Sequence, residues 1–135
     1  MADDVILNKA EMIENCIGRI QEEFAGASPN LRQNQTKQDS IILNLERACQ
    51  AAIDMAMRVV RLRRLGLPKE SREAFDLLQG ASIIDDALCK RMHGLVGFRN
   101  TAIHNYKKLD LDIVEAVITH RLQDFRDLIK ICVQL

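Results

Sequence analysis

Apolar residues recur at steps of three and four along most of this chain, the spacing that gathers them on one face of an α-helix. The first such run extends from Ile6 to Phe24 and predicts a helix. Residues 26–35 are polar and include Pro29, so we expect a loop there. The next run predicts a long helix over residues 39–65. Its apolar arc is wide, which suits a central place in a bundle or a second contact with another subunit.

Three further helices are predicted in the second half of the chain. Gly66 and Pro68 are expected to end the long helix. The three helices are expected over residues 69–79, from a capping-box-like sequence at residues 82–85 through residue 106, and from a second such sequence at residues 112–115 to Cys132. No segment alternates like a strand. We therefore expect an all-α, up-down helical bundle of four main helices plus one short helix, forming a single domain over residues 1–135.

Charge and composition narrow the function classes. The 19 basic and 19 acidic side chains cancel, so a nucleic acid would have to bind a local patch rather than a general positive field. No apolar run approaches the length that spans a bilayer. The N-terminus carries Asp3 and Asp4 where a secretory signal would be basic. These features predict a cytoplasmic protein without membrane contact.

Cysteine and histidine spacing gives no sign of a metal site. Cys16, Cys49, Cys89 and Cys132 lie on different predicted helices, and we expect them to be buried, reduced thiols. His93 and His120 have no ligand-like companions in the sequence, so we expect ordinary surface or boundary residues. No metal and no cofactor is expected.

The segment 98–106 holds the strongest candidate chemistry. It brings together Arg99, His104 and the only tyrosine of the chain, Tyr106. Arginine can hold a phosphate with two hydrogen bonds, and histidine can transfer a proton near neutral pH. Asn100 and Asn105 are placed to orient the histidine or to donate to a phosphate. Spacing alone favours a simpler interpretation, a solvated helix end with a core tyrosine.

The spacing of Arg99 and His104 is awkward for a single site. Five residues of regular helix separate them by about 7.5 Å along the axis and place them on different sides. Either the helix loosens near His104, or a second copy of the chain completes the site.

Two other charged features are candidates. Arg58, Arg61, Arg63 and Arg64 form a basic cluster, which is either a solvated helix end or a patch that contacts RNA or an acidic partner. Asp54 is expected to pair with Arg58 one turn later, and the alternative is that it reaches the active cleft and orients Arg99 or His104.

The sequence from residue 92 to residue 106 resembles the signature of the HEPN superfamily, and most closely its HepT-like toxin branch. That signature is an arginine with a polar neighbour, a histidine four to six positions later, and a tyrosine two beyond. Arg99, Asn100, His104 and Tyr106 match these elements. Residues 51–54, 65–68 and 75–78 resemble the same branch, so the likeness covers most of the chain.

The resemblance implies the toxin of a toxin–antitoxin pair, a metal-independent endoribonuclease acting as a homodimer. In that scheme His104 moves the proton of the ribose 2′-hydroxyl or of the leaving oxygen, and Arg99 stabilises the charge on the phosphorane. The implied partner is a nucleotidyltransferase of the MNT type, which inhibits the toxin by AMPylation of Tyr106. The RNA itself would be the substrate.

Two alternatives to this interpretation stay open. One is a non-catalytic HEPN subunit that binds a minimal nucleotidyltransferase and presents its substrate, because fold alone does not determine function. The other is a helical dimer without any role in nucleic-acid chemistry. A complete set of Arg99, His104 and Tyr106 favours the ribonuclease, because a binding module has no need of all three.

Overall fold

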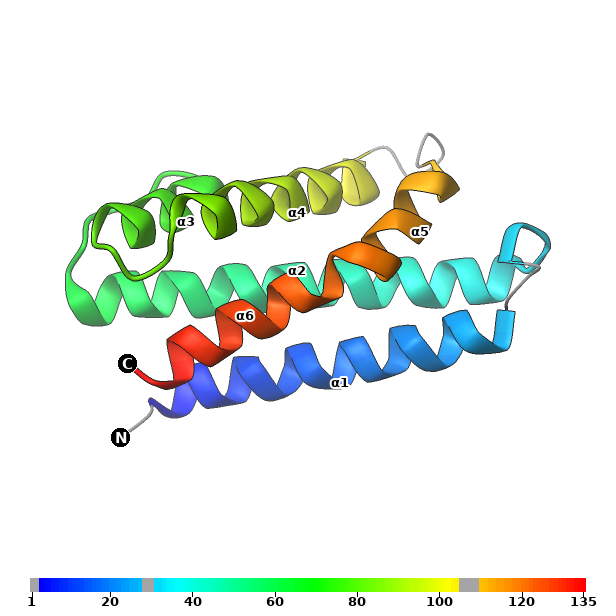
Figure 1. The fold of residues 1–135 in the computed structure, drawn as a ribbon, viewed down its shortest axis with the longest axis horizontal. Helices are drawn as coiled ribbons and strands as arrows, with labels where there is room; N and C mark the ends of the chain where they lie inside the picture. The colour runs from blue at the N-terminus through cyan, green and yellow to red at the C-terminus, as the bar shows by residue number, and fades with distance from the viewer. Residues whose placement is uncertain (1–2, 28–30, 105–109) are drawn as a thin grey trace.

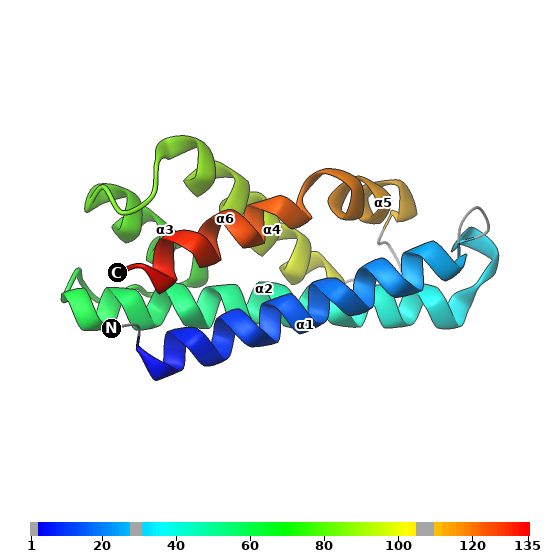
Figure 2. The ribbon, with the colours of Figure 1, turned by 60° about the horizontal axis from the view of Figure 1, so that its bottom comes forward.

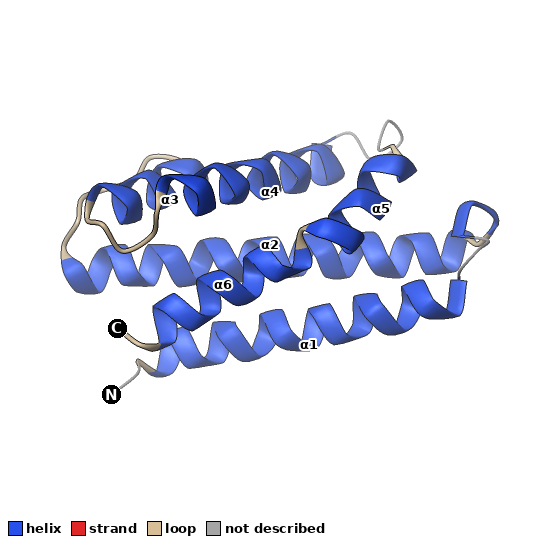
Figure 3. Ribbon diagram, viewed as in Figure 1, coloured by secondary structure: helices blue, strands red, loops and turns tan. Residues whose placement is uncertain are grey.

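A computed structural model describes residues 3–27, 31–104 and 110–135. This part of the chain is helical and contains no strand (Figure 3). Its elements are α1 (Asp4–Ala27), a 3₁₀ helix η1 (Leu31–Gln33), α2 (Gln35–Arg63), α3 (Ser71–Gly80), α4 (Asp86–His104), α5 (Leu111–His120) and α6 (Leu122–Val133). The prediction of an all-α protein is confirmed.

The long helices alternate in direction. Helix α2 runs antiparallel to α1, α4 runs back along α2, and α5 and α6 return toward the end at which the chain begins (Figures 1 and 2). The short α3 lies between α2 and α4 in the chain and packs against both. This is the expected up-down order of four long segments and one short helix.

Helix α2 is the centre of the bundle. It packs against α1, α3, α4 and α6, and twelve of its residues are buried. Most of the wide apolar arc is buried, because Ala51, Ile53 and Met55 are buried as well as the main stripe that contains Leu45 and Val59. Met57 is only partly buried, and Leu43 and Leu62 are exposed. The four cysteines are free and buried, as expected.

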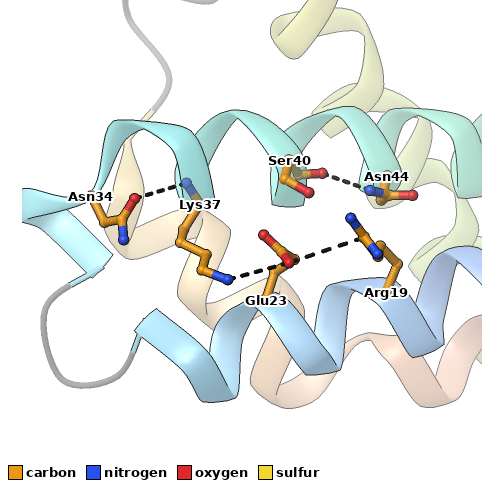
Figure 4. A network of polar contacts seen from close by, with 6 residues as sticks. All are labelled: Arg19, Glu23, Asn34, Lys37, Ser40 and Asn44. Atoms are coloured by element: carbon orange, nitrogen blue, oxygen red, sulfur yellow. Dashed lines mark hydrogen bonds and ion pairs between the residues drawn. The ribbon is translucent and has the colours of Figure 1, made fainter.

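Helix α2 begins four residues before its predicted start. The side chain of Asn34 accepts a hydrogen bond from the backbone N–H of Lys37 at 3.0 Å, which caps the first turn. The ammonium of Lys37 lies 3.3 Å from Glu23 of α1, and Glu23 is also within 4.0 Å of Arg19 (Figure 4). The cap and this cross-helix contact extend α2 into a stretch whose polar composition suggested a loop.

The predicted capping boxes do not cap the later helices. Asp85 caps α4 by accepting from the N–H of Leu88 at 2.8 Å, whereas Ser82 has a positive φ of 60° in the preceding turn. Asp110 caps α5 by accepting from the N–H of Asp112 at 2.8 Å. In both places a single aspartate just before the helix accepts from one backbone N–H of the first turn, and the predicted box residues do not supply the cap.

The end of α2 also differs slightly from the prediction. The left-handed residue that follows the helix is Arg64, with φ of 53°, and its N–H donates to the carbonyls of Arg61 and Val60. Gly66, predicted to end the helix, comes two residues later with a φ of 146°.

The predicted final helix is divided into two at Arg121, which ends α5 and precedes α6. The apolar repeat continues through this point, so the sequence pattern contains no sign of a break. The bend lets α5 lie over the end of α4 while α6 packs against α1 and α2 (Figures 1 and 2). It also places Asp124, in the first turn of α6, against α4.

Asp124 is the one buried charged residue of the described ranges, at 4% exposed. One of its oxygens lies 2.9 Å from Nε of Arg91 on α4, and Arg121 is 4.0 Å from the other oxygen. Burial raises the pKa of the Asp124 carboxyl, and the positive charges of Arg91 and Arg121 counteract only part of that effect.

We expect Arg91→Met to destabilise the fold by about 2 kcal/mol at pH 7, below the roughly 3–5 kcal/mol of a fully buried pair because Arg91 is partly exposed. The loss should shrink on acidification. Without Arg91 the folded-state pKa of Asp124 rises further above its unfolded value, so protonation at lower pH favours the folded state. Urea denaturation at pH 7 and pH 5 measures both effects. Arg126→Met is the matched control, because the side chain of its partner Glu14 is 45% exposed, against 6% for Asp124, and the pair should contribute little. An equal loss at both pH values would contradict this account.

Across the part of the chain that the structure describes, no helix combines the length and the apolar character that a membrane crossing requires.

Candidate functional site

Helix α4 carries the candidate catalytic residues, and it stays helical through His104. The helix therefore does not loosen between Arg99 and His104, which removes the first of the two arrangements considered for the motif. Arg99 and His104 remain about 7.5 Å apart along the axis and about 140° apart around it, since each residue turns the helix by about 100°. Within one chain they face different directions.

Arg99 is half-buried and lacks an acidic partner among the described residues. Its Nη1 donates to the side chain of Asn100 at 3.4 Å, and its buried Nε has no hydrogen-bond partner. The three other half-buried arginines of the described ranges each face a carboxylate. Arg58 pairs with Asp3, Arg91 with Asp124 and Arg126 with Glu14.

Among the described residues no carboxylate lies beside Arg99, in contrast to the other half-buried arginines, and this leaves its charge available for a ligand. A partly desolvated cation normally recruits a counter-charge, because burial without one is costly. A guanidinium held near the surface without a carboxylate is available for an anion supplied from outside, and a phosphate fits its planar donors. Arg99 has this environment.

Cys49 of α2 is the buried thiol next to Arg99. The charge of Arg99 is close enough to affect the pKa of Cys49 on α2. Burial nevertheless raises the pKa of the Cys49 thiol to about 12, and the nearby guanidinium lowers it only in part. Cys49 is therefore a protonated packing residue at neutral pH and not a nucleophile.

His104 is the last residue of α4 and is exposed. This position leaves its imidazole open to solvent and to a substrate. Asn105 and Tyr106, the two other predicted residues of the segment, lie outside the described residues.

Asn100 lines a small polar pocket between α3 and α4. The other lining residues are Glu70, Ser71, Arg72 and Val96. Arg72 is an exposed cation 27 positions before Arg99 in the sequence, and packing of α3 on α4 brings it to the pocket that Asn100 shares. The sequence contained no signal for this contact, because it depends on how the two helices pack.

A larger cleft, of about 470 Å³, lies between α4 and α5 on another face of α4. It is lined by apolar and small residues such as Gly94, Phe98 and Val117, and neither Arg99 nor His104 belongs to it. The candidate catalytic residues therefore lie at the surface of α4 and outside this cleft.

The expected pairing of Asp54 with Arg58 is wrong. Asp54 lies 3.4 Å from Lys9 of α1 and accepts a hydrogen bond from Gln50, whereas Arg58 binds both oxygens of Asp3. These contacts arise because α1 lies antiparallel along α2. Lys9 and Asp3 therefore lie closer to Asp54 and Arg58 than those two residues lie to each other. The side-chain hydrogen bond from Arg58 is the main reason that the pKa of Asp3 is lowered. Asp54 is thus held by side chains of α1 and α2, and neither Arg99 nor His104 is an ion-pair or hydrogen-bond partner of it in the described residues.

The predicted basic cluster is divided by the fold. Arg58 is engaged with Asp3, while Arg61, Arg63 and Arg64 are exposed at the C-terminal end of α2. That end lies where α4 begins, and α4 runs away from it to reach His104 (Figure 1). Within one chain, the basic cluster and the motif are therefore at different places on the surface.

His93 is a boundary residue, as expected, but it has ligand-like neighbours that the sequence did not show. Its Nε2 lies 2.7 Å from Oδ1 of Asp76 on α3, and the Cys89 thiol lies 3.6 Å from the same oxygen. These three residues are the one group of metal-ligand type found among the described residues. The spacing of Cys89 and His93, four residues apart on a helix, was the available signal, but Asp76 comes from another helix.

Fold and site together define a helical bundle whose third long segment, α4, presents an exposed histidine and an arginine that has no carboxylate partner in the described residues. Comparison with known proteins agrees with that description. The sequence model of the family described as Ribonuclease HepT-like matches residues 13–131. The chain therefore belongs to the Ribonuclease HepT-like family, as the resemblance of its motif suggested.

Individual relatives match over nearly the whole chain. The mRNA nuclease HepT of Shewanella oneidensis is 43% identical over 129 residues, which is 96% of each protein. A solved toxin–antitoxin structure with AMP-PNP contains a chain that is 42% identical, with a TM-score of 0.91, and the match covers 96% of this chain and 98% of that one. The tri-AMPylated HEPN toxin of Shewanella oneidensis, solved with its MNT antitoxin, is 43% identical with a TM-score of 0.91 over 96% of each chain.

A solved structure of much lower sequence identity has a similar fold. The cytosolic protein YutE of Bacillus subtilis is 14% identical, with a TM-score of 0.69, and the match covers 89% of this chain and 85% of that one. At this identity the likeness concerns the fold alone.

Proposed function

We propose that this chain is the toxin of a toxin–antitoxin pair, an endoribonuclease that cleaves RNA without a metal ion. The observation that carries the proposal is the state of Arg99, the half-buried arginine without a carboxylate partner in the described residues. The names of the relatives support it, since one is an mRNA nuclease and another a HEPN toxin bound to an MNT antitoxin.

The proposed chemistry uses the 2′-hydroxyl of the RNA as the nucleophile. His104 removes its proton or protonates the leaving 5′-oxygen, as a positioned imidazole can do near neutral pH. The 2′-oxygen then bonds to phosphorus while the bond to the 5′-oxygen breaks. The products are a 2′,3′-cyclic phosphate and a 5′-hydroxyl. Arg99 stabilises the negative charge that builds on the phosphorane oxygens, and Asn100 orients the guanidinium through its hydrogen bond.

The site is proposed to need two copies of the chain. Because α4 stays helical, Arg99 and His104 of one chain face different directions, and a second α4 across a homodimer would bring the missing group to the same phosphate. The exposed Ile103, next to His104, and the exposed Ile113 on α5 provide apolar surface for such a contact. Asn105 is proposed to assist in the same cleft, and Arg61, Arg63 and Arg64 to hold the RNA backbone or an acidic partner elsewhere.

An assay of product ends tests this proposal. We expect the purified full-length chain to cleave RNA in the presence of EDTA and to leave 2′,3′-cyclic phosphate and 5′-hydroxyl ends. A substrate with a single 2′-deoxy sugar at the cleaved position should survive, because it lacks the nucleophile. The matched all-ribose substrate is the control. Cleavage of the 2′-deoxy substrate, or a strict need for added Mg²⁺, would refute the mechanism. Absence of cleavage with intact binding of the nucleotidyltransferase would favour the non-catalytic alternative.

A further inference from the structure

We propose that Asp76, Cys89 and His93 form a zinc-binding site that ties α3 to α4. This site goes beyond the proposed ribonuclease activity and plays no part in the cleavage step. It supplies the three classes of protein ligand that zinc prefers, a thiolate, an imidazole and a carboxylate.

The geometry of the three ligand atoms fits one ion. Cys89 and His93 are four residues apart, so both project from the same face of α4 toward α3. The ligand atoms of the three residues all lie within 4.8 Å of one another. The distance from Cys89 Sγ to Asp76 Oδ1 is 3.6 Å, which is about the ligand–ligand separation of a tetrahedral zinc with its usual bond lengths.

The imidazole needs a small adjustment. His93 Nε2 and Asp76 Oδ1 lie 2.7 Å apart, a hydrogen-bond distance, whereas ligands of one tetrahedral zinc would be about 3.4 Å apart. Side chains of His93 and Asp76 are 35% and 52% exposed, so the ring has room to move. The same exposure provides an entry path for the ion.

Charge balance favours a divalent cation. Without an ion, one carboxylate oxygen lies within hydrogen-bond distance of both the thiol and the imidazole. On binding, the S–H bond of Cys89 breaks, its proton goes to solvent, and the thiolate bonds to the metal. His93 binds through the lone pair of Nε2 and keeps its proton on Nδ1. One carboxylate, one thiolate and a neutral imidazole then offset the two positive charges of the ion, and water takes the fourth position.

An ion bound at this site would link α3 to α4. Cys89 is 3% exposed, so the ion is anchored at the edge of the core, while Asp76 attaches it to α3. A second contact already joins the helices here, because Nε of Arg72 donates to the carbonyl of His93 at 3.3 Å. Asn100 lies seven residues beyond His93 on the same face of α4 and shares its pocket with Arg72. The ion would therefore hold the α3–α4 contact beside the catalytic arginine without touching the substrate.

Titration of the untagged full-length chain with Zn²⁺ and with Co²⁺ tests the site. We expect one ion per chain by native mass spectrometry. Bound Co²⁺ should give a thiolate-to-cobalt charge-transfer band in the near ultraviolet. Zn²⁺ should also raise the melting temperature. Cys89→Ser should abolish the band, and His93→Gln and Asp76→Asn should each weaken Zn²⁺ binding at least tenfold. His93 and Asp76 are partly exposed, so these two variants should remain folded.

Two matched variants separate this site from binding elsewhere. Cys16→Ser removes a buried thiol on α1, and His120→Gln removes an exposed imidazole on α5, and both should bind as the unaltered chain does. A wild-type chain without the charge-transfer band overturns the proposal. Zn²⁺ affinity that is the same in His93→Gln as in the unaltered chain overturns it as well, because the ion would then be held elsewhere.

Discussion

Arg99→Ala should lower the rate of RNA cleavage by about 10²–10³-fold, the usual effect of removing one donor to a developing oxyanion. His104→Ala should lower it by about 10²–10⁴-fold through loss of proton transfer. Arg99 contributes no ion pair to the described fold, so its removal should leave the helical content unchanged. Cleavage of a defined RNA by the purified variants, with circular dichroism of the same samples, measures both quantities.

Two surface variants are the controls for this prediction. His120→Ala removes an exposed imidazole on α5, and Arg19→Ala removes an exposed guanidinium on α1 that reaches Glu23 at 4.0 Å. Both should cleave RNA at the rate of the unaltered chain. If Arg99→Ala and His104→Ala were equally active, the cleavage would come from another protein in the preparation or from other residues.

The same two variants also test whether the site is shared between subunits. Co-expression of Arg99→Ala with His104→Ala produces mixed dimers in which one intact arginine and one intact histidine remain. A cleft lined by both chains predicts partial recovery of cleavage in the mixed sample and none in either variant alone. A mixture as inactive as its two components would argue against the shared cleft.

We propose that a partner nucleotidyltransferase transfers AMP to Tyr106, and Tyr106→Phe should then abolish AMP transfer to this chain. Tyr106 is the only tyrosine of the sequence, so a phenolic acceptor has no substitute. AMPylation fits inhibition physically. It adds a phosphate that can pair with Arg99 and a nucleoside that blocks access to the cleft. The tri-AMPylated state of the Shewanella oneidensis toxin supports a modification of this kind.

Intact-mass analysis after co-expression with the nucleotidyltransferase measures the modification. We expect AMP-sized increments on the unaltered chain and none on Tyr106→Phe. The phenylalanine variant keeps the ring, so it should still cleave RNA and should escape inhibition. Thr101→Val, which removes a hydroxyl five residues away on α4, is the matched control and should still be modified. Increments that persist on Tyr106→Phe would place the acceptor elsewhere.

The periodic pattern of apolar residues was sufficient to predict the helical class and most of the buried face of each helix. It was sufficient because burial of one face is a local property that each helix carries in its own spacing. Helix ends were less predictable. Three helices are capped by single side chains, those of Asn34, Asp85 and Asp110. Other polar residues near each of these positions could also cap a helix, so the sequence does not show which one does. The break between α5 and α6 at Arg121 could not be predicted, because the apolar repeat continues through it.

The amino-acid sequence was enough to list the chemical groups of this protein and to place Arg99 and His104 on one helical segment. The environment of each group depends on how the helices pack. Arg58 and Arg99 are both half-buried cations, yet one meets Asp3 and the other meets no carboxylate in the described chain. His93, an isolated histidine in the sequence, gains Asp76 when α3 packs on α4. Charge pairing and ligand sets depend on side chains that meet across helices, and such contacts follow from packing rather than from local spacing.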